Sequence, residues 1–218
     1  MHIEPGYIAQ AKVMLANVSL LGVMAYYARG LFSQPSNIVR MLLAALFFSL
    51  FMQSFHMNVG PSELHFVGAM AMYLTLGFLP TLFGFVFGLL LQGLLFDPKD
   101  MAHLAVNALS LIVPLIAVHY TLGRKLRDAA TGQRIAWGAI LKLDALYYSG
   151  VTAMVGFWLL AADVATPFAA WASFAASYLA IVALEPLFTY AIVRLLKRYE
   201  GARWVDICFA VDSLKLAD

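Results

Sequence analysis

The sequence predicts an all-α membrane protein, a bundle of about seven transmembrane helices that forms a single integral membrane domain over residues 1–218. The chain is strongly apolar, with 63% hydrophobic residues and a mean hydropathy of +0.83. Only 12% of its residues are charged, about half the share found in soluble domains. Several apolar stretches reach the roughly 20 residues that a helix needs to cross a bilayer.

Seven apolar stretches are expected to cross the membrane: residues 9–28, 38–55, 65–82, 83–96, 101–122, 137–161 and 168–196. The third and fourth join through Gly77-Phe78-Leu79-Pro80 with no polar loop between them, and the fourth is short. The seventh would measure about 43 Å as a continuous helix. It must therefore tilt, kink at Pro186 or extend into the cytoplasm.

The first stretch is expected to be retained rather than cleaved as a signal peptide. A signal peptide begins with basic residues, whereas the first eleven residues here carry Glu4 and neither Lys nor Arg. The polypeptide should therefore keep its own amino terminus.

The charges of the loops predict the orientation of the chain. With the N-terminus outside, every Lys and Arg except Lys12 and Lys99 falls in an inner loop or in a cytoplasmic tail at about 197–218. The positive-inside rule requires this asymmetry, so a bacterial inner membrane with the C-terminus in the cytoplasm is expected. The basic loop 123–134 would bind anionic membrane lipid or a cytoplasmic partner.

The predicted outer loops are acidic. Their carboxylates are those of Glu4, Glu63, Asp97, Asp100 and Asp163. An acidic outer face raises the local concentration of divalent cations. The alternative is that these are ordinary polar loop residues.

The sequence lacks the features that several classes of protein require. A net charge of +2 is too small to indicate a nucleic-acid partner. There is no GxGxxG or GxxxxGK[ST] pattern, so nucleotide is not bound by those routes. A lone cysteine, Cys208, excludes an internal disulfide and a Cys-rich metal knuckle.

The first residues of the chain, Met1-His2-Ile3-Glu4-Pro5-Gly6, are the candidate metal-binding arm, taken as residues 1–8. The Met1 amine, the deprotonated His2 amide and the His2 imidazole form two fused chelate rings in one plane. Three planar nitrogens suit Ni(II), Cu(II) and low-spin Co(II). These donors bind only without their protons, so affinity should fall in acid. A histidine at position two also occurs by chance, so the pattern needs support elsewhere.

The stretch 56–68, HMNVGPSELHFVG, supplies a fourth donor on the same predicted face. His65 is the candidate, and Gly68 would permit close backbone approach. The alternative is a hydrogen-bonded histidine at the membrane interface. His56 and Glu63 are weaker candidates for roles around the metal or along its access route.

Polar side chains also interrupt the apolar spans. Glu185 must face protein or a water-filled cavity, because a charge at the bilayer centre costs about 2.5–3.5 kcal/mol on insertion scales. Gln92 and Asn107 are expected to hydrogen-bond between helices or to position the amino-terminal arm. His103 lies on the same predicted face as Asn107. A GxxxG spacing at 84–88 allows close helix packing, either internal or against a partner subunit.

Taken together, the chain resembles the metal-specific membrane component (CbiM/NikM type) of energy-coupling-factor cobalt and nickel transporters. The matching stretches follow the family's order: MHIEPG at the start, HFVG at 65–68, LLLQGLLF at 89–96, Asn107 and EPLFT at 185–189. The resemblance implies a seven-helix bundle with the outside N-terminus folded into its centre. It also implies Met1, His2 and His65 as ligands of a transported Co²⁺ or Ni²⁺. Expected partners are a transmembrane coupling subunit and cytoplasmic ATPases that hydrolyse ATP, so the chain itself is not an enzyme.

The sequence departs from the family's pattern at Pro5, where an acidic residue often precedes the glycine. The Ser62-Glu63-Leu64-His65 segment is also one residue longer than the family's usual spacing. A stand-alone secondary transporter is the main alternative, with Glu185 as its acidic relay. An intramembrane metalloprotease ranks last, because the sequence has no HExxH motif.

Overall fold

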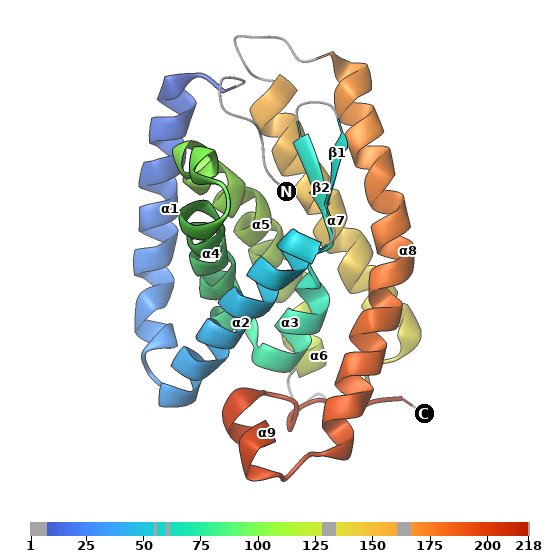
Figure 1. Cartoon of the computed structure of the whole chain (residues 1–218). Coiled ribbons are helices and arrows are strands. Elements are labelled where there is room, and N and C mark those ends of the chain that lie inside the picture. The colour runs from blue at the N-terminus through green and yellow to red at the C-terminus, as the bar shows by residue number, and fades with distance from the viewer. Residues whose placement is uncertain (1–7, 55, 60–61, 128–133, 161–166, 218) are drawn as a thin grey trace.

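A computed structural model describes residues 8–54, 56–59, 62–127, 134–160 and 167–217. These residues form an upright helical bundle with one small hairpin (Figure 1). The helices are α1 (Gln10–Leu31), α2 (Pro35–Ser54), α3 (Ala69–Leu76), α4 (Phe78–Leu95), α5 (Leu104–Val118), α6 (Arg124–Arg127), α7 (Trp137–Leu160), α8 (Phe168–Arg198) and α9 (Arg203–Cys208). A short 3₁₀ helix, Pro98–His103, precedes α5, and a π-helical turn, His119–Gly123, follows it.

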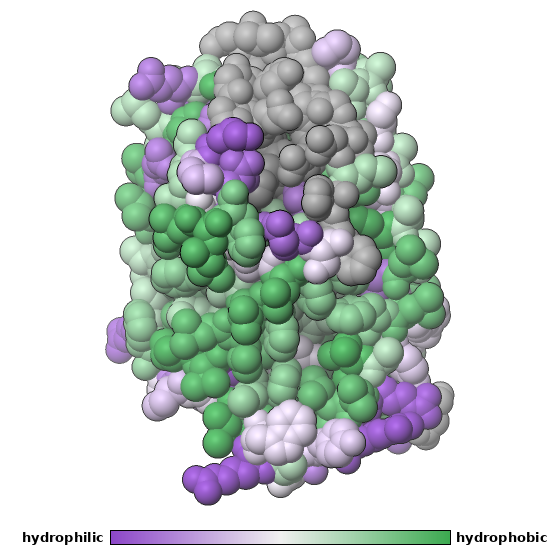
Figure 2. Space-filling view, in the orientation of Figure 1, coloured by the Kyte–Doolittle hydropathy of each residue, from purple (hydrophilic) through white to green (hydrophobic). Residues whose placement is uncertain are grey.

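In the described part of the chain, six helical segments are long and apolar enough to cross a membrane. They are Gln10–Leu31, Pro35–Ser54, Phe78–Leu95, Pro98–Arg127, Trp137–Leu160 and Phe168–Arg198. Their outer faces carry large exposed apolar side chains, such as Val18 and Leu21 on α1 and Leu179 on α8. Figure 2 shows hydrophobic residues across the middle of one face, with hydrophilic residues mainly toward the two ends. The predicted all-α, multi-pass membrane bundle is therefore confirmed.

The closest packing within the bundle joins α2 to α4 and depends on glycine. A Cβ built on Gly84 would lie 2.3 Å from the Ala44 Cβ, and one on Gly88 would lie 2.5 Å from the Phe48 Cδ1. Only a hydrogen at these positions lets the two backbones approach so closely. The GxxxG spacing therefore serves internal packing and not a partner subunit.

The predicted third span, residues 65–82, is divided in the structure. Helix α3 has only eight residues, about 12 Å at the rise of an α-helix, and ends at Gly77, whose φ is 100°. Residues other than glycine rarely adopt that φ. Gly77 therefore interrupts the helix and separates α3 from α4. Residues 78–82 belong to α4, and the boundary predicted between 82 and 83 is wrong. All eight α3 residues are buried, so α3 is a half-length helix inside the bundle.

The stretch predicted as a loop before this span contains an antiparallel hairpin. Strand β1 (His56–Val59) pairs with β2 (Ser62–His65), and the register places His56 opposite His65. The hairpin lies beside α8 in the upper half of the bundle (Figure 1). His65 therefore ends a strand and does not open a helix.

The C-terminal segment packs against the lower end of the bundle. Val205, Val211 and Leu214 are buried, and the Ala210 amide donates to the Thr75 carbonyl at 2.6 Å. The expected tail at about 197–218 is thus a docked segment over its described residues.

Arg127, expected in a basic surface loop, reaches the same region. Its guanidinium donates to the carbonyls of Tyr73 at 3.0 Å, Leu74 at 2.5 Å and Ala210 at 3.3 Å. It satisfies carbonyl groups at the C-terminal end of α3, where a cation is favoured.

Candidate functional site

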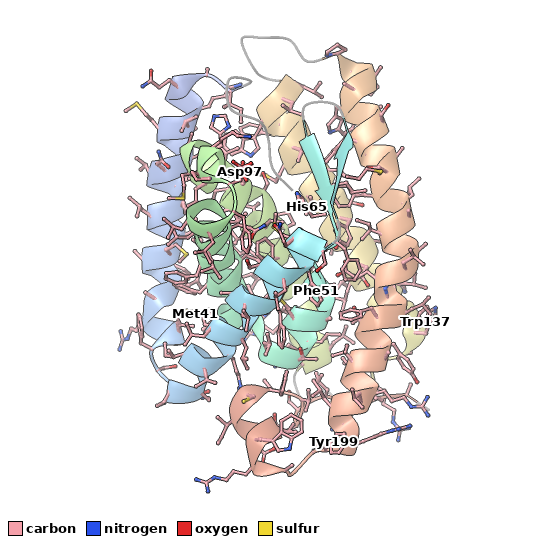
Figure 3. All side chains as sticks on the ribbon, in the orientation of Figure 1. Met41, Phe51, His65, Asp97, Trp137 and Tyr199 are labelled. Atoms are coloured by element: carbon pink, nitrogen blue, oxygen red, sulfur yellow. The ribbon has the colours of Figure 1, made fainter. Side chains whose placement is uncertain are left out.

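His65 is the one predicted metal ligand that lies among the described residues, and it points into protein. Its side chain is only 4% exposed. The ring Nδ1 lies 3.2 Å from the Met52 carbonyl at the end of α2. A carbonyl only accepts, so Nδ1 carries the proton and the lone pair of the neutral ring is on Nε2. This is the arrangement in which metal-binding histidines are commonly held, with one nitrogen donating to a carbonyl. Figure 3 shows His65 between the levels of Asp97 and Phe51, in the middle of the bundle.

Gly68 fixes the chain immediately after His65. Its φ of 64° is in the left-handed region, and a Cβ there would lie 2.8 Å from the Phe51 Cε2. Phe51 packs edge-to-face on Phe66 and Phe188, with ring centroids 5.7 and 5.5 Å apart. Gly68 lets the Phe51 ring pack closely on the backbone, and an aromatic cluster holds the segment that carries His65.

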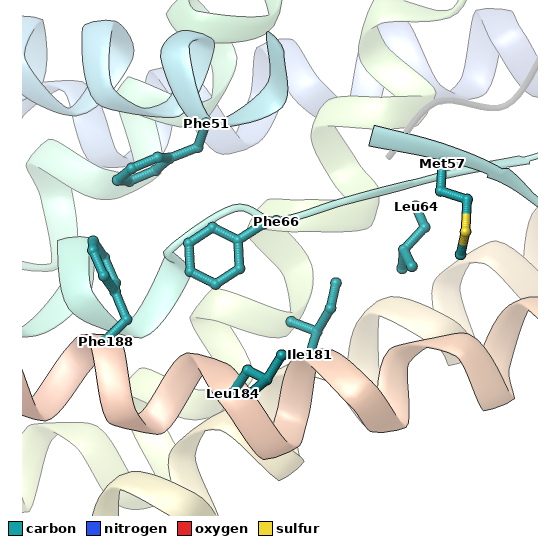
Figure 4. Close-up of a pocket in the computed structure, with 7 residues that line it drawn as sticks. All are labelled: Phe51, Met57, Leu64, Phe66, Ile181, Leu184 and Phe188. Atoms are coloured by element: carbon teal, nitrogen blue, oxygen red, sulfur yellow. The ribbon is translucent and has the colours of Figure 1, made fainter. Parts of the chain in front are cut away.

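A cavity of about 610 Å³ lies between the hairpin and α8, but it is not a metal site. Figure 4 shows its seven lining residues, which are Phe51, Met57, Leu64, Phe66, Ile181, Leu184 and Phe188. None of them has a nitrogen or carboxylate donor. In a membrane, an opening lined in this way suits an apolar chain and not a cation.

Gln92 connects α4 to the turn of α2 that holds His65. The Ser49 hydroxyl donates to the Gln92 Oε1 at 3.0 Å, and the Gln92 Nε2 donates to the Gln53 Oε1 at 3.1 Å. Gln53 is next to Met52, whose carbonyl binds His65. These bonds join α4 to α2, as expected for Gln92. Its other predicted role, positioning the amino-terminal arm, concerns residues outside the described ranges. Ser49 and Gln53 were not identified from the sequence, because polar residues near a helix end are common.

His103 and Asn107 both turn inward at the upper part of the bundle. His103 is 5% exposed at the end of the 3₁₀ helix, and Asn107 is 1% exposed one turn into α5. Their burial indicates polar contacts within protein and not lipid contact. His119, directly after α5, stacks on Phe78 with ring centroids 3.9 Å apart, and its Nδ1 lies 3.0 Å from the Tyr73 hydroxyl oxygen.

The remaining predicted ligands, Met1 and His2, lie outside the described residues, as does Glu4. The side chains of His56 and Glu63 are likewise not described. Ile8, the first described residue, is 7% exposed and belongs to the apolar core. Within the described ranges, no three His, Cys, Asp or Glu side chains converge as a metal site. His65 is therefore the one predicted ligand whose surroundings the structure describes, and its role as a metal ligand stays a prediction.

A second polar site lies below the hairpin, and of its two carboxylates only Glu185 is among the residues predicted from the sequence. Glu185 is fully buried, accepting from the Met70 amide at 3.3 Å and from the Tyr148 hydroxyl. Asp144 of α7 is equally buried, and it interacts electrostatically with Glu185. Glu185 is thus not the sole acidic residue inside the spans. The signal for Asp144 was its place within the apolar stretch LKLDALYY.

Comparison with known proteins gives one match. The model of a family described as the cobalt uptake substrate-specific transmembrane region matches residues 2–202. No curated protein and no solved structure matches the chain.

Proposed function

The chain belongs to the family of cobalt uptake substrate-specific transmembrane components, and on that premise we propose that it captures Co²⁺ or Ni²⁺ outside the membrane and passes the ion inward. It would do so as the substrate-specific component of an ATP-driven energy-coupling-factor transporter. The chain is a transport component and not itself an enzyme. A transmembrane coupling subunit and cytoplasmic ATPases would supply the energy, since this sequence carries no phosphate-binding glycine loop.

The proposed metal ligands are the Met1 amine, the His2 amide and imidazole, and the His65 imidazole. The observation that carries this proposal is the state of His65, which is buried with its Nδ1 held by the Met52 carbonyl. Four nitrogen donors in one plane favour Ni(II) and low-spin Co(II) over ions that prefer oxygen or tetrahedral sites. Cobalt is the first choice because the family is one of cobalt uptake.

The position of His65 supports capture from the outer face. It lies at the inner end of the hairpin, above the middle of the bundle and away from the docked C-terminal segment (Figure 3). Most Lys and Arg belong to loops at that C-terminal end, which is the predicted cytoplasmic side. An amino-terminal arm on the outer face could therefore reach His65 without crossing the membrane.

The test is uptake of radioactive Co²⁺ into vesicles that contain the chain and its partner subunits. His65→Ala, and separately one extra residue before Met1, should each reduce uptake to background, because each removes one donor of the planar set. A matched control is His119→Ala, which removes an imidazole near the opposite end. Full uptake by the extended chain would contradict the proposed chelate.

A stand-alone secondary transporter is the second candidate, favoured by the two carboxylates buried within the spans. Such a transporter would couple metal movement to protons through intramembrane acidic groups. Uptake that continues when the ATPase subunits are omitted would support it over the energy-coupling-factor role.

A further inference from the structure

Buried polar atoms without protein partners gather where α3, α7 and α8 meet. Neither carboxylate oxygen of Asp144 has a hydrogen-bond partner among the described residues. The same holds for the hydroxyls of Tyr147, Tyr178 and Thr189. All four side chains are at most 2% exposed. An unsatisfied buried group costs about 1–3 kcal/mol, so such groups in a native protein commonly indicate a bound ion or water.

Asp144, Tyr147 and Tyr178 each lie close enough to Glu185 to interact with it electrostatically, and Thr189 lies one turn after Glu185 in α8. The Tyr147 hydroxyl interacts electrostatically with Glu185, Tyr178 and Asp144. Tyr148 donates its hydroxyl to Glu185, and its ring contacts those of Tyr147 and Tyr178 at centroid distances of 5.1 Å. These ring contacts hold the hydroxyls in place.

Glu185 is also fixed by the backbone. The Met70 amide, in the first turn of α3, donates to its Oε1 at 3.3 Å. The positive end of a half-length helix stabilises an anion. No Lys, Arg or His in the described part of the chain forms an ion pair with Glu185 or Asp144. Two carboxyl groups buried this close together are tolerated when a proton or a cation neutralises them, and these residues provide no cation.

We propose that Asp144 and Glu185, with the hydroxyls of Tyr147, Tyr178 and Thr189, form a second divalent-cation site within the bundle. It rests on the proposed function, because its ligand is the transported ion on its way inward. A divalent cation carries the charge that cancels two carboxylates, and carboxylate and hydroxyl oxygens suit a weakly held ion of the Mn²⁺ to Co²⁺ type.

The fold places this second site below the first. The chain passes from His65 through Gly68 directly into α3, whose first turn binds Glu185. Asp144 lies one helical turn before Tyr148 in α7, and Thr189 lies one turn after Glu185 in α8. Since α7 and α8 run in opposite directions, both lie nearer the lower end (Figure 1). An ion leaving His65 would meet Glu185 first and Asp144 next. Weak oxygen ligation at such a step favours onward release, as conduction requires.

The binding test uses Mn²⁺ alone as the probe, followed by electron paramagnetic resonance of the purified chain. Mn²⁺ prefers oxygen donors and binds planar nitrogen sites poorly. The native chain should bind one Mn²⁺, displaceable by Co²⁺, and His65→Ala should bind it equally. Asp144→Asn and Glu185→Gln should each weaken this binding at least tenfold. Failure of the native chain to bind Mn²⁺ would overturn the proposal.

The transport test compares the same variants in vesicles with partner subunits. Asp144→Asn and Glu185→Gln should keep Co²⁺ binding at the outer site, which also reports correct folding, yet lose at least tenfold in uptake rate. The matched control is Asp206→Asn, which neutralises an exposed carboxylate.

A third variant separates a ligand role from a structural one. Tyr147→Phe removes only an unsatisfied hydroxyl, so it should leave thermal stability unchanged or raised while weakening Mn²⁺ binding severalfold. Unaltered uptake by Asp144→Asn would overturn the second site and leave the proposed function standing. The proposed function itself fails if the native chain binds no Co²⁺ through nitrogen and supports no uptake.

Discussion

Replacing Gly68 with alanine tests whether the segment after His65 sets the geometry of the metal site. Alanine at a φ of 64° costs about 1–2 kcal/mol. Its Cβ would also lie 2.8 Å from the Phe51 Cε2. Phe51 has room to move, because it lines the apolar cavity beside α8. Moving it would disturb two edge-to-face ring contacts, worth about 0.5–1.5 kcal/mol each.

The expected loss of stability for Gly68→Ala is therefore about 2–5 kcal/mol. For a chain of this length, that lowers the Tm by roughly 4–20 °C, measured by thermal unfolding in detergent. Co²⁺ affinity should also fall at least tenfold, because the backbone shift moves His65 away from the Met52 carbonyl.

Two other glycines provide matched controls for this variant. Gly201 has a φ of 85° with nothing within 4 Å, so Gly201→Ala isolates the backbone cost of about 1–2 kcal/mol. Gly22 lies in α1 with open space around its Cβ position, so Gly22→Ala should be neutral or stabilising. If Gly68→Ala is as stable as Gly22→Ala and binds metal with native affinity, Gly68 does not set the geometry of the metal site.

Three further predictions follow from the fold and the chelate. Arg127→Met should lower the Tm by several degrees, because carbonyls at the end of α3 lose their donor. The control is Arg124→Met, at an exposed position, which should leave the Tm unchanged. If the two variants have the same Tm, Arg127 does not stabilise the end of α3. Gly84→Ala should destabilise the α2–α4 contact by about 1–3 kcal/mol, whereas Gly138→Ala, with nothing within 4 Å, should not; denaturant titration compares them. Co²⁺ affinity should fall at least about tenfold per pH unit below pH ~7, because an α-amine and imidazoles bind only without their protons; a flat pH titration would exclude the amine as a ligand.

The sequence predicts the long helices well because hydropathy and length suffice for them. The expected spans 137–161 and 168–196 correspond to Trp137–Leu160 and Phe168–Arg198. It does not place the α3–α4 boundary, because that depends on the backbone conformation of Gly77 and not on hydropathy. The hairpin is not predicted from the sequence either, because two four-residue strands give only a weak alternation of apolar and polar residues.

The candidate site was predictable in its chemistry but not in its surroundings. His65 was identified by its place beside a glycine-containing segment, and its burial agrees with a role inside the protein. The contact to Met52 and the support from Gln92 depend on tertiary packing, which spacing alone cannot give. Asp144 shows the opposite case, since one charge in an apolar stretch was a visible signal. Met1 and His2 stay predictions.

X-ray absorption at the metal edge of the Ni²⁺- or Co²⁺-loaded chain, with its native amino terminus, tests the central claim most directly. For the native chain, four nitrogen donors in one plane are predicted. In His65→Ala, one of these nitrogen donors should be missing or replaced by another kind of atom. A spectrum with mainly oxygen neighbours, or one unchanged by His65→Ala, would contradict an amino-terminal chelate completed by His65.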